Sequence, residues 1–215
     1  MRPRLSRDAR MEQVLDVAHR LFAEKGYAAA TMDEIAAAVG VTKPLLYTYF
    51  GNKERLYVAC MERSGDALIE AVTAAVAATT SPTRALAAGV RAFFAFLDSD
   101  RAAWAVLFDE TLPIHGEVAE HVGAYRARIL RFVAGSIRAQ LPEDRRRAAE
   151  PEIEALSSAV LGAAEALARW WLRTEALDAG QAAELLIATI EPGLRARSGG
   201  LSTSSDPPPK GPRTR

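Results

Sequence analysis

The sequence predicts an all-α fold in which a small N-terminal domain is joined through a long fourth helix to a larger helical domain. Apolar residues recur at helical spacing along most of the 215 residues, and capping residues precede most of these repeats. Sustained apolar–polar alternation and Asn-Gly or Asp-Gly turns, which are typical of strands, do not occur in the sequence. The helix stop signals divide the chain into residues 1–52, residues 53–196 and a tail over 197–215.

Two capped helices are expected at the start of the chain. Residues 11–22 place apolar side chains at three- and four-residue steps, as on one face of an amphipathic helix. Ser6 can cap this helix and Gly26 can end it. The segment Thr31–Glu34 has the form of a capping box, so a short second helix is expected to follow it and to end at Gly40.

The third predicted helix is only about two turns long, yet it is rich in bulky side chains. Thr42 can cap it, Pro44 occupies its first turn, and Gly51 ends it. Asn52 can then cap a fourth helix that runs from about Lys53 to Thr79. Two short helices joined by a tight glycine turn form a helix-turn-helix, although the same arrangement also occurs in α-proteins that never bind DNA.

The remaining helices are expected to be longer. Their predicted ranges are 82–98, 101–112, 114–141, 151–175 and 179–196, the last of which opens at a second capping-box pattern, Asp178–Gln181. The charged segment 143–152 is predicted to be a connecting loop. The tail over 197–215 is rich in Ser, Pro and Gly and is predicted to be disordered, because it cannot bury enough apolar surface to offset its ordering entropy.

The short third helix is predicted to have one buried and one exposed face. Leu46 and Phe50 are four residues apart and can anchor it in a small core, which leaves the rest of its surface for a partner. Hydroxyl groups at helix N-termini, phenols and ammonium groups can bind phosphates, and lysine can also bind a guanine edge in the major groove. The candidate DNA-binding residues are Thr31, Thr42, Lys43, Pro44, Leu45, Tyr47, Thr48, Tyr49 and Lys53.

The segment TMDEIAAAVGVTKPLLYTYFGNKERLY resembles the DNA-binding signature of the TetR-type bacterial transcriptional regulators. The resemblance is specific over about residues 10–58, and it departs from the family pattern at Pro44-Leu45, where a small residue is common. It implies a regulator that binds an inverted-repeat operator in double-stranded DNA as a homodimer. The matching positions are Phe22 to Tyr27, Thr31, Ile35-Ala36, Gly40-Val41, Thr42, Leu46 to Phe50 and Asn52-Lys53.

The same resemblance implies that the larger domain encloses an effector cavity and dimerises through its last two helices. Apolar stripes and small residues over 151–175 and 179–196 allow two such helix pairs to pack as a four-helix interface, or else serve the core of one chain. Aromatic side chains are the candidates for binding a small, largely apolar effector, although aromatics at helical spacing also fill ordinary cores. They are Phe93, Phe94, Phe96, Trp104, Phe108, His115, Tyr125 and Trp170.

Other classes of function have little support in the sequence. It contains no G-x-S-x-G motif, phosphate-binding glycine loop, dinucleotide fingerprint or H-E-x-x-H motif, so neither enzyme activity nor a cofactor is expected. Glu117 and His121 share a helical face but have no third ligand nearby, so no metal site is expected. A single cysteine, the lack of an apolar signal-peptide region and the lack of a bilayer-length apolar run indicate a cytoplasmic protein.

The net charge is zero but is unevenly distributed. Residues 1–56 hold nine Lys and Arg against seven Asp and Glu, whereas residues 57–196 hold fourteen against nineteen. The charge distribution therefore excludes a uniformly basic nucleic-acid-binding surface over the whole protein. It is compatible with a small basic nucleic-acid-binding surface at the N-terminus. We expect a repressor that a small apolar ligand releases from its operator. The alternatives are an activator, a ligand-independent regulator, or an all-α adaptor that does not bind DNA.

Overall fold

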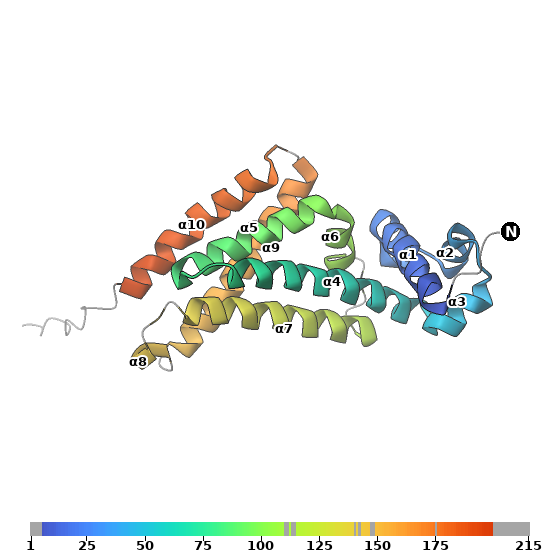
Figure 1. Ribbon diagram of the computed structural model, residues 1–215, viewed down its shortest axis with the longest axis horizontal. Coiled ribbons are helices and arrows are strands. Elements are labelled where there is room, and N and C mark those ends of the chain that lie inside the picture. The colour runs from blue at the N-terminus through green and yellow to red at the C-terminus, as the bar shows by residue number, and fades with distance from the viewer. Residues whose placement is uncertain are drawn as a thin grey trace, which may run out of the picture.

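The computed structural model describes residues 6–109, 112, 115–139, 141, 143–146, 149–174 and 176–199, which contain helices and no strand. The N-terminal helices α1 to α3 gather at one end of the molecule, and α4 runs from them into the larger domain, where it packs against α5 and α7 (Figure 1). The helices are α1 (Arg7–Ala29), α2 (Met32–Val39), α3 (Lys43–Phe50), α4 (Lys53–Ala77), α5 (Pro82–Ser99), α6 (Arg101–Leu107), α7 (Glu117–Arg138), α8 (Glu143–Arg146), α9 (Glu150–Thr174) and α10 (Ala179–Gly199).

Most predicted caps are confirmed. The Ser6 hydroxyl accepts a hydrogen bond from the first turn of α1 at 3.2 Å, and Asn52 Oδ1 does the same for α4 at 2.7 Å. At the start of α10, Asp178 and Gln181 form the reciprocal capping box that the sequence predicts. Thr42 is different: it occupies the N-cap position of α3, but its side chain makes no cap hydrogen bond within the described part of the chain.

The predicted end of the sixth helix is wrong, because α6 ends at Leu107 instead of near residue 112. Phe108 leaves the helical geometry with φ −128° and ψ 32°, and its ring stacks on Trp104 with centroids 4.1 Å apart. The next residue, Asp109, accepts a hydrogen bond from the backbone amide of Tyr27, 82 positions earlier in the chain. A tertiary contact with the N-terminal domain therefore accompanies the end of this helix.

Further boundaries differ from the predictions. Helix α7 spans Glu117–Arg138 instead of residues 114–141. Helix α1 continues to Ala29, although Gly26 interrupts its regular geometry with φ 77° and ψ 164°. The predicted loop over 143–152 contains the one-turn helix α8, beside which the Arg146 side chain donates a hydrogen bond to the carbonyl of Leu141 at 3.1 Å. The last helix extends to Gly199, three residues into the predicted tail, and residues 200–215 lie outside the described residues.

The core of the N-terminal domain confirms the two-faced reading of α3. Leu46 is fully buried and Phe50 is 8% exposed, and both belong to one buried cluster with Ile35 and Val39 of α2 and Phe22 of α1. The cluster continues along α4 toward α6 and α7, so the two domains share a continuous apolar core. Helix α3 is consequently held by packing that reaches into the larger domain.

His19 is buried in α1, where its Nε2 lies 2.9 Å from the Ser64 hydroxyl of α4. Burial lowers the pKa of His19, and the nearby Arg63 lowers it further, whereas Asp100 and Asp16 oppose the shift. The imidazole is thus kept neutral at a contact between α1 and α4. Protonating it would place a charge in a site that is poorly solvated.

Lowering the pH from about 7.5 to about 5.5 is expected to reduce the free energy of unfolding through His19. Below about pH 6.5 the unfolded chain binds a proton that the folded protein takes up only at lower pH, so stability falls as the pH falls through this window. Urea unfolding at the two pH values should show a smaller loss in His19→Gln than in the wild type. Equal losses in both proteins would contradict this role of His19.

Candidate DNA-binding surface and effector cavity

The exposed face of α3 carries most of the predicted DNA-binding residues. Lys43, Pro44, Tyr47 and Thr48 are exposed, whereas Leu45 is half-buried. Tyr47 has 43% of its surface exposed, which is unusual for so large a side chain and leaves both its ring and its hydroxyl accessible. This exposed face lies at the end of the molecule formed by α1 to α3 (Figure 1). The arrangement presents one short helix, anchored from behind, to an external partner.

Lys43 is held by Asp33 of α2. Its Nζ lies 2.8 Å from Asp33 Oδ2, both side chains are exposed, and this hydrogen bond raises the pKa of Lys43. An exposed ion pair of this kind contributes little to stability, because water and salt screen it. Lys43 can therefore exchange Asp33 for a phosphate or a base edge without a large loss, and Asp33 orients the lysine until it does.

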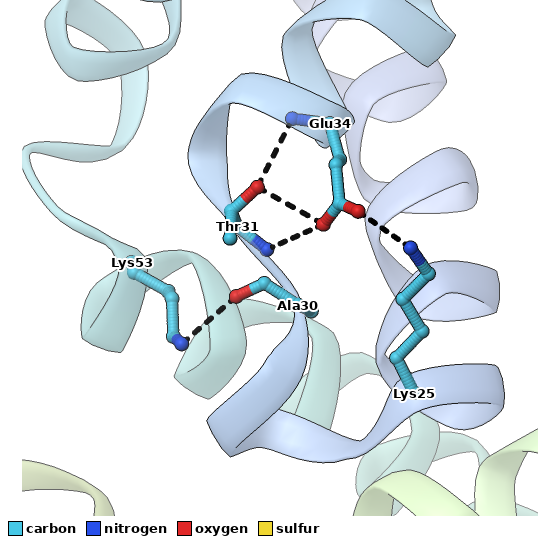
Figure 2. Close-up of polar contacts among 5 residues, drawn as sticks. All are labelled: Lys25, Ala30, Thr31, Glu34 and Lys53. Carbon is cyan, nitrogen blue, oxygen red and sulfur yellow. Dashed lines mark hydrogen bonds and ion pairs between the residues drawn. The ribbon is translucent and has the colours of Figure 1, made fainter.

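Thr31 uses its hydroxyl within the protein. Its Oγ1 accepts from the amide of Glu34 at 3.3 Å and donates to Glu34 Oε2 at 2.9 Å, and the same carboxylate oxygen accepts from the Thr31 amide (Figure 2). Lys25 also donates to Glu34 at 2.5 Å, and this bond, followed by those from Thr31, lowers the pKa of Glu34. The predicted capping box is confirmed, and it occupies the hydroxyl that the sequence suggested for phosphate.

Lys53, which the sequence suggests as a DNA-binding residue, is half-buried in the structure. Its ammonium donates to the backbone carbonyl of Ala30 at 2.9 Å and to that of Ala28 at 3.3 Å, and it lies 4.5 Å from the centre of the Tyr27 ring. Burial lowers the pKa of Lys53. In contrast to Lys43, this lysine points back into the turn between α1 and α2 (Figure 2).

The remaining candidate DNA-binding residues, Thr42, Thr48 and Tyr49, differ in exposure and in their contacts. The Thr48 hydroxyl donates to the Pro44 carbonyl at 2.9 Å, while Thr42 stays exposed. Tyr49 is half-buried, and the guanidinium carbon of Arg7 lies 5.8 Å from its ring centre. Arg7 was not among the predicted site residues, although the basic N-terminal segment was a signal for it. It adds an exposed positive charge beside the recognition helix.

A cavity of about 390 Å³ lies in the larger domain between α4, α6, α7 and α9. Such a volume is sufficient for a small molecule. Of the aromatic residues predicted to bind an effector, Phe108 and Tyr125 line it. The full lining is Met61, Leu107, Phe108, Asp109, Leu112, Ala119, Val122, Tyr125, Arg126, Ile129, Glu165 and Arg169.

Four charged residues of this lining were missed by the sequence analysis: Asp109, Arg126, Glu165 and Arg169. Arg126 Nη1 lies 3.0 Å from Glu165 Oε1, in an ion pair whose angle does not suit a hydrogen bond, and the Glu165 side chain is only 13% exposed. Glu165 and Arg169 are one helical turn apart, and in the sequence this spacing is typical of an exposed ion pair on a helix surface. The cavity therefore combines an apolar wall with a polar, charge-balanced part.

The other predicted effector residues are distributed differently. Phe93 lines a separate small cavity of about 40 Å³ that shares Ile129 with the larger one, and Trp104 reaches the larger cavity only through its stacking on Phe108. Phe94 is fully buried against Trp171, and Phe96 is half-buried against the core. His115 is exposed, and Trp170 is 39% exposed on α9. The structure thus brings Phe108 and Tyr125 together at the larger cavity, with Trp104 stacked on Phe108.

Asp109 of the cavity lining, and Val106 and Val118 beside it in the chain, are hydrogen-bonded to α1 or to the first turns of α4. Asp109 Oδ2 accepts from the Tyr27 amide at 2.5 Å, and Tyr57 of α4 donates its hydroxyl to the carbonyl of Val106 at 2.6 Å. The Glu54 carboxylate of α4 accepts from the amide of Val118, at the start of α7, at 3.3 Å. These three hydrogen bonds connect residues at and beside the cavity with α1 and with the first turns of α4, next to α3.

Neither a metal site nor a membrane span is found in the described part of the chain. No group of three or more His, Cys, Asp and Glu side chains is arranged to hold a metal ion there. None of its helices is both long enough and apolar enough to cross a bilayer.

The chain matches two family models. Residues 14–60 match the bacterial regulatory proteins of the tetR family, and residues 82–191 match the tetracyclin repressor-like C-terminal domain. The chain is also 40% identical over 119 residues to the HTH-type transcriptional activator FasR of Mycolicibacterium smegmatis. That match covers 55% of this chain and 54% of FasR, so the chain spans about half the length of this relative.

Solved structures show the same fold. A TetR-like transcriptional regulator from Rhodococcus sp. RHA1 superposes with a TM-score of 0.73 at 29% identity, over 89% of this chain and 99% of the other. AibR, solved in complex with isovaleryl coenzyme A and operator DNA, superposes with a TM-score of 0.68 at 24% identity, over 85% of this chain and 98% of AibR. With both family models covering the two domains described above, the chain belongs to the TetR family of bacterial regulatory proteins.

Proposed function

We propose that this protein is a homodimeric transcriptional regulator that inserts α3 into the major groove of an operator. The two-faced α3 carries this proposal: Leu46 and Phe50 are buried, while Lys43 and Tyr47 face outward. A helix anchored in this way can present its N-terminal half to base edges. Family membership supports the same function, as does the exposed Arg7 beside the recognition helix.

The proposed dimer interface is formed by α9 and α10, the last two helices. Each carries a large apolar side chain on its surface, since Trp170 of α9 is 39% exposed and Leu185 of α10 is 51% exposed. Burying such side chains against a second copy is favourable, and aromatic residues are enriched in the centre of interfaces. A two-fold dimer would place two copies of α3 on the two half-sites of an inverted repeat.

The proposed effector is a small, largely apolar molecule with a polar end, bound in the 390 Å³ cavity. Most of the lining is apolar. Arg126 and Arg169 provide two positive charges in its polar part, where Asp109 and Glu165 provide two negative charges. AibR has the same fold and was solved with an acyl coenzyme A, so acyl thioesters are reasonable first probes. At 24% identity this likeness supports the capacity of the fold to hold such a molecule.

The proposed sign of regulation is repression that the effector relieves. FasR, with 40% identity over the matched segment, is an activator by name, and this favours activation as the second candidate. Both outcomes use the same DNA contacts, because the position of the operator relative to the promoter decides whether binding blocks or assists transcription. A reporter gene carrying the selected operator, with and without the protein, separates them.

Selection of bound sequences from random double-stranded DNA tests the DNA-binding proposal. We expect an inverted repeat whose half-site centres lie about 34 Å, or a multiple of this distance, apart. We also expect affinity to fall with salt at a log–log slope of about −0.9 for each phosphate neutralised. Light scattering of the same preparation should give a dimer. A monomer that selects no motif would refute the proposal.

A further inference from the structure

Lys53 stands at the first position of α4, where the amide groups of a helix N-terminus favour an anion. The ammonium nevertheless points away from this N-terminus and into the turn that joins α1 to α2 (Figure 2). It donates to the carbonyls of Ala30 and Ala28 at 2.9 and 3.3 Å, and the face of the Tyr27 ring covers it at 4.5 Å. Two carbonyls and an aromatic face together satisfy a lysine ammonium well.

The two carbonyls lie where α1 ends. The last carbonyls of a helix have no partner within the helix. Here Gly26 breaks the regular geometry, and Ala30 already has the extended backbone that leads to α2. Ala30 directly precedes Thr31, the N-cap of α2, so the direction of its carbonyl sets the direction in which the chain enters α2. Through its hydrogen bond to the Ala30 carbonyl, Lys53 connects the start of α2 to the start of α4.

A second lysine holds the same N-terminus from the other side. Lys25 of α1 donates a hydrogen bond to the Glu34 carboxylate. This carboxylate also accepts hydrogen bonds from the amide and from the hydroxyl of Thr31 (Figure 2). The start of α2 is therefore fixed at its carbonyl side by Lys53 and at its capping box by Lys25. Helix α3 follows α2 after three residues, so this fixed N-terminus also sets the placement of the recognition helix.

We propose that Lys53 is a positioning residue for DNA binding, which sets the α2–α3 pair relative to α4 instead of binding a phosphate itself. The inference rests on the proposed DNA-binding function and deepens it. Its physical basis is the set of contacts that already occupies the ammonium, in contrast to Lys43, which pairs with the exposed carboxylate of Asp33. In this proposal Lys53 orients the α1–α2 turn, whereas Lys43 contacts DNA directly.

The salt dependence of operator binding separates the two roles. In Lys53→Met, which keeps the apolar stem of the side chain, we expect operator affinity to fall about tenfold with an unchanged log–log salt slope, since no phosphate contact is lost. The matched variant Lys43→Met should reduce the slope by about 1 if that lysine binds a phosphate. A slope reduced by about 1 in Lys53→Met would overturn the proposal, because it would make Lys53 a direct phosphate ligand.

Amide hydrogen exchange of the DNA-free protein provides a readout that does not depend on an operator. We expect the amides of residues 28–35 to exchange faster in Lys53→Met than in the wild type, with Lys43→Met unchanged over these residues. Lys53→Arg keeps donors for the two carbonyls and is expected to restore both protection and affinity. Unchanged exchange over 28–35 in Lys53→Met would overturn the proposal. If the wild type bound no DNA, the proposed function would fail, while this measurement would still decide whether Lys53 orders the turn.

Discussion

Replacing Leu46 by alanine is expected to lower the free energy of unfolding by about 2–5 kcal/mol, because it removes buried methyl groups from a core that can collapse only in part. Leu46 is fully buried from α3 and packs in the cluster that includes Ile35 and Phe50. The small N-terminal domain has few alternative side chains that can fill the space. Urea unfolding, followed by circular dichroism, measures the loss.

The neighbouring variant Tyr47→Ala is the matched control, since it alters an exposed side chain of the same helix. Tyr47 is 43% exposed, so its removal is expected to change the free energy of unfolding by no more than about 0.5 kcal/mol. Operator binding should nevertheless be impaired in Tyr47→Ala, which retains the fold. Similar losses of stability in the two variants would contradict the assignment of one anchoring and one DNA-facing side to α3.

Gly65→Ala is expected to destabilise the protein by about 1–3 kcal/mol through overpacking. A Cβ at this position of α4 would lie 2.3 Å from Cε2 and 2.7 Å from Cζ of the Tyr125 ring. Tyr125 has little room to move, because it is 9% exposed and its hydroxyl donates to the Gly65 carbonyl at 2.5 Å. As Tyr125 also lines the large cavity, the substitution should disturb effector binding as well.

Gly123→Ala in α7 is the control with the opposite expected sign. A Cβ there meets no atom within 4 Å, and the position is exposed in the interior of a helix. Alanine is favoured over glycine in such a position by about 0.5–1 kcal/mol, so Gly123→Ala should raise the thermal midpoint while Gly65→Ala lowers it. Equal shifts in both variants would show that the close approach of Tyr125 to Gly65 does not constrain α4.

The N-terminal domain was predictable from the sequence because its signals are local. The caps at Ser6, Thr31 and Asn52 act on amides within the first turn of their own helices, and the glycines that end α2 and α3 do so through their own backbone. The four-residue spacing of Leu46 and Phe50 selects the buried face of α3 through helix geometry alone. None of these features needs a residue that is distant in the chain.

The effector cavity was only partly predictable, because helix packing decides which aromatic residues line a space and which fill the core. Phe93 and Phe94 are adjacent in the sequence, yet one lines a small cavity and the other packs against Trp171. The charged pair of Arg126 and Glu165 comes from two different helices, so neither residue signals a cavity when its own helix is considered.

The sequence by itself determined the all-α class, the helix-turn-helix and the buried face of α3, since propensity, capping and periodicity act over one or two helical turns. Only the tertiary structure decided where α6 ends, where Lys53 points and which charges meet in the cavity. Asp109 meets the Tyr27 amide across 82 positions, and Lys53 meets the Ala30 carbonyl across 23. Such contacts depend on the relative placement of whole helices, which the period of a single helix does not encode.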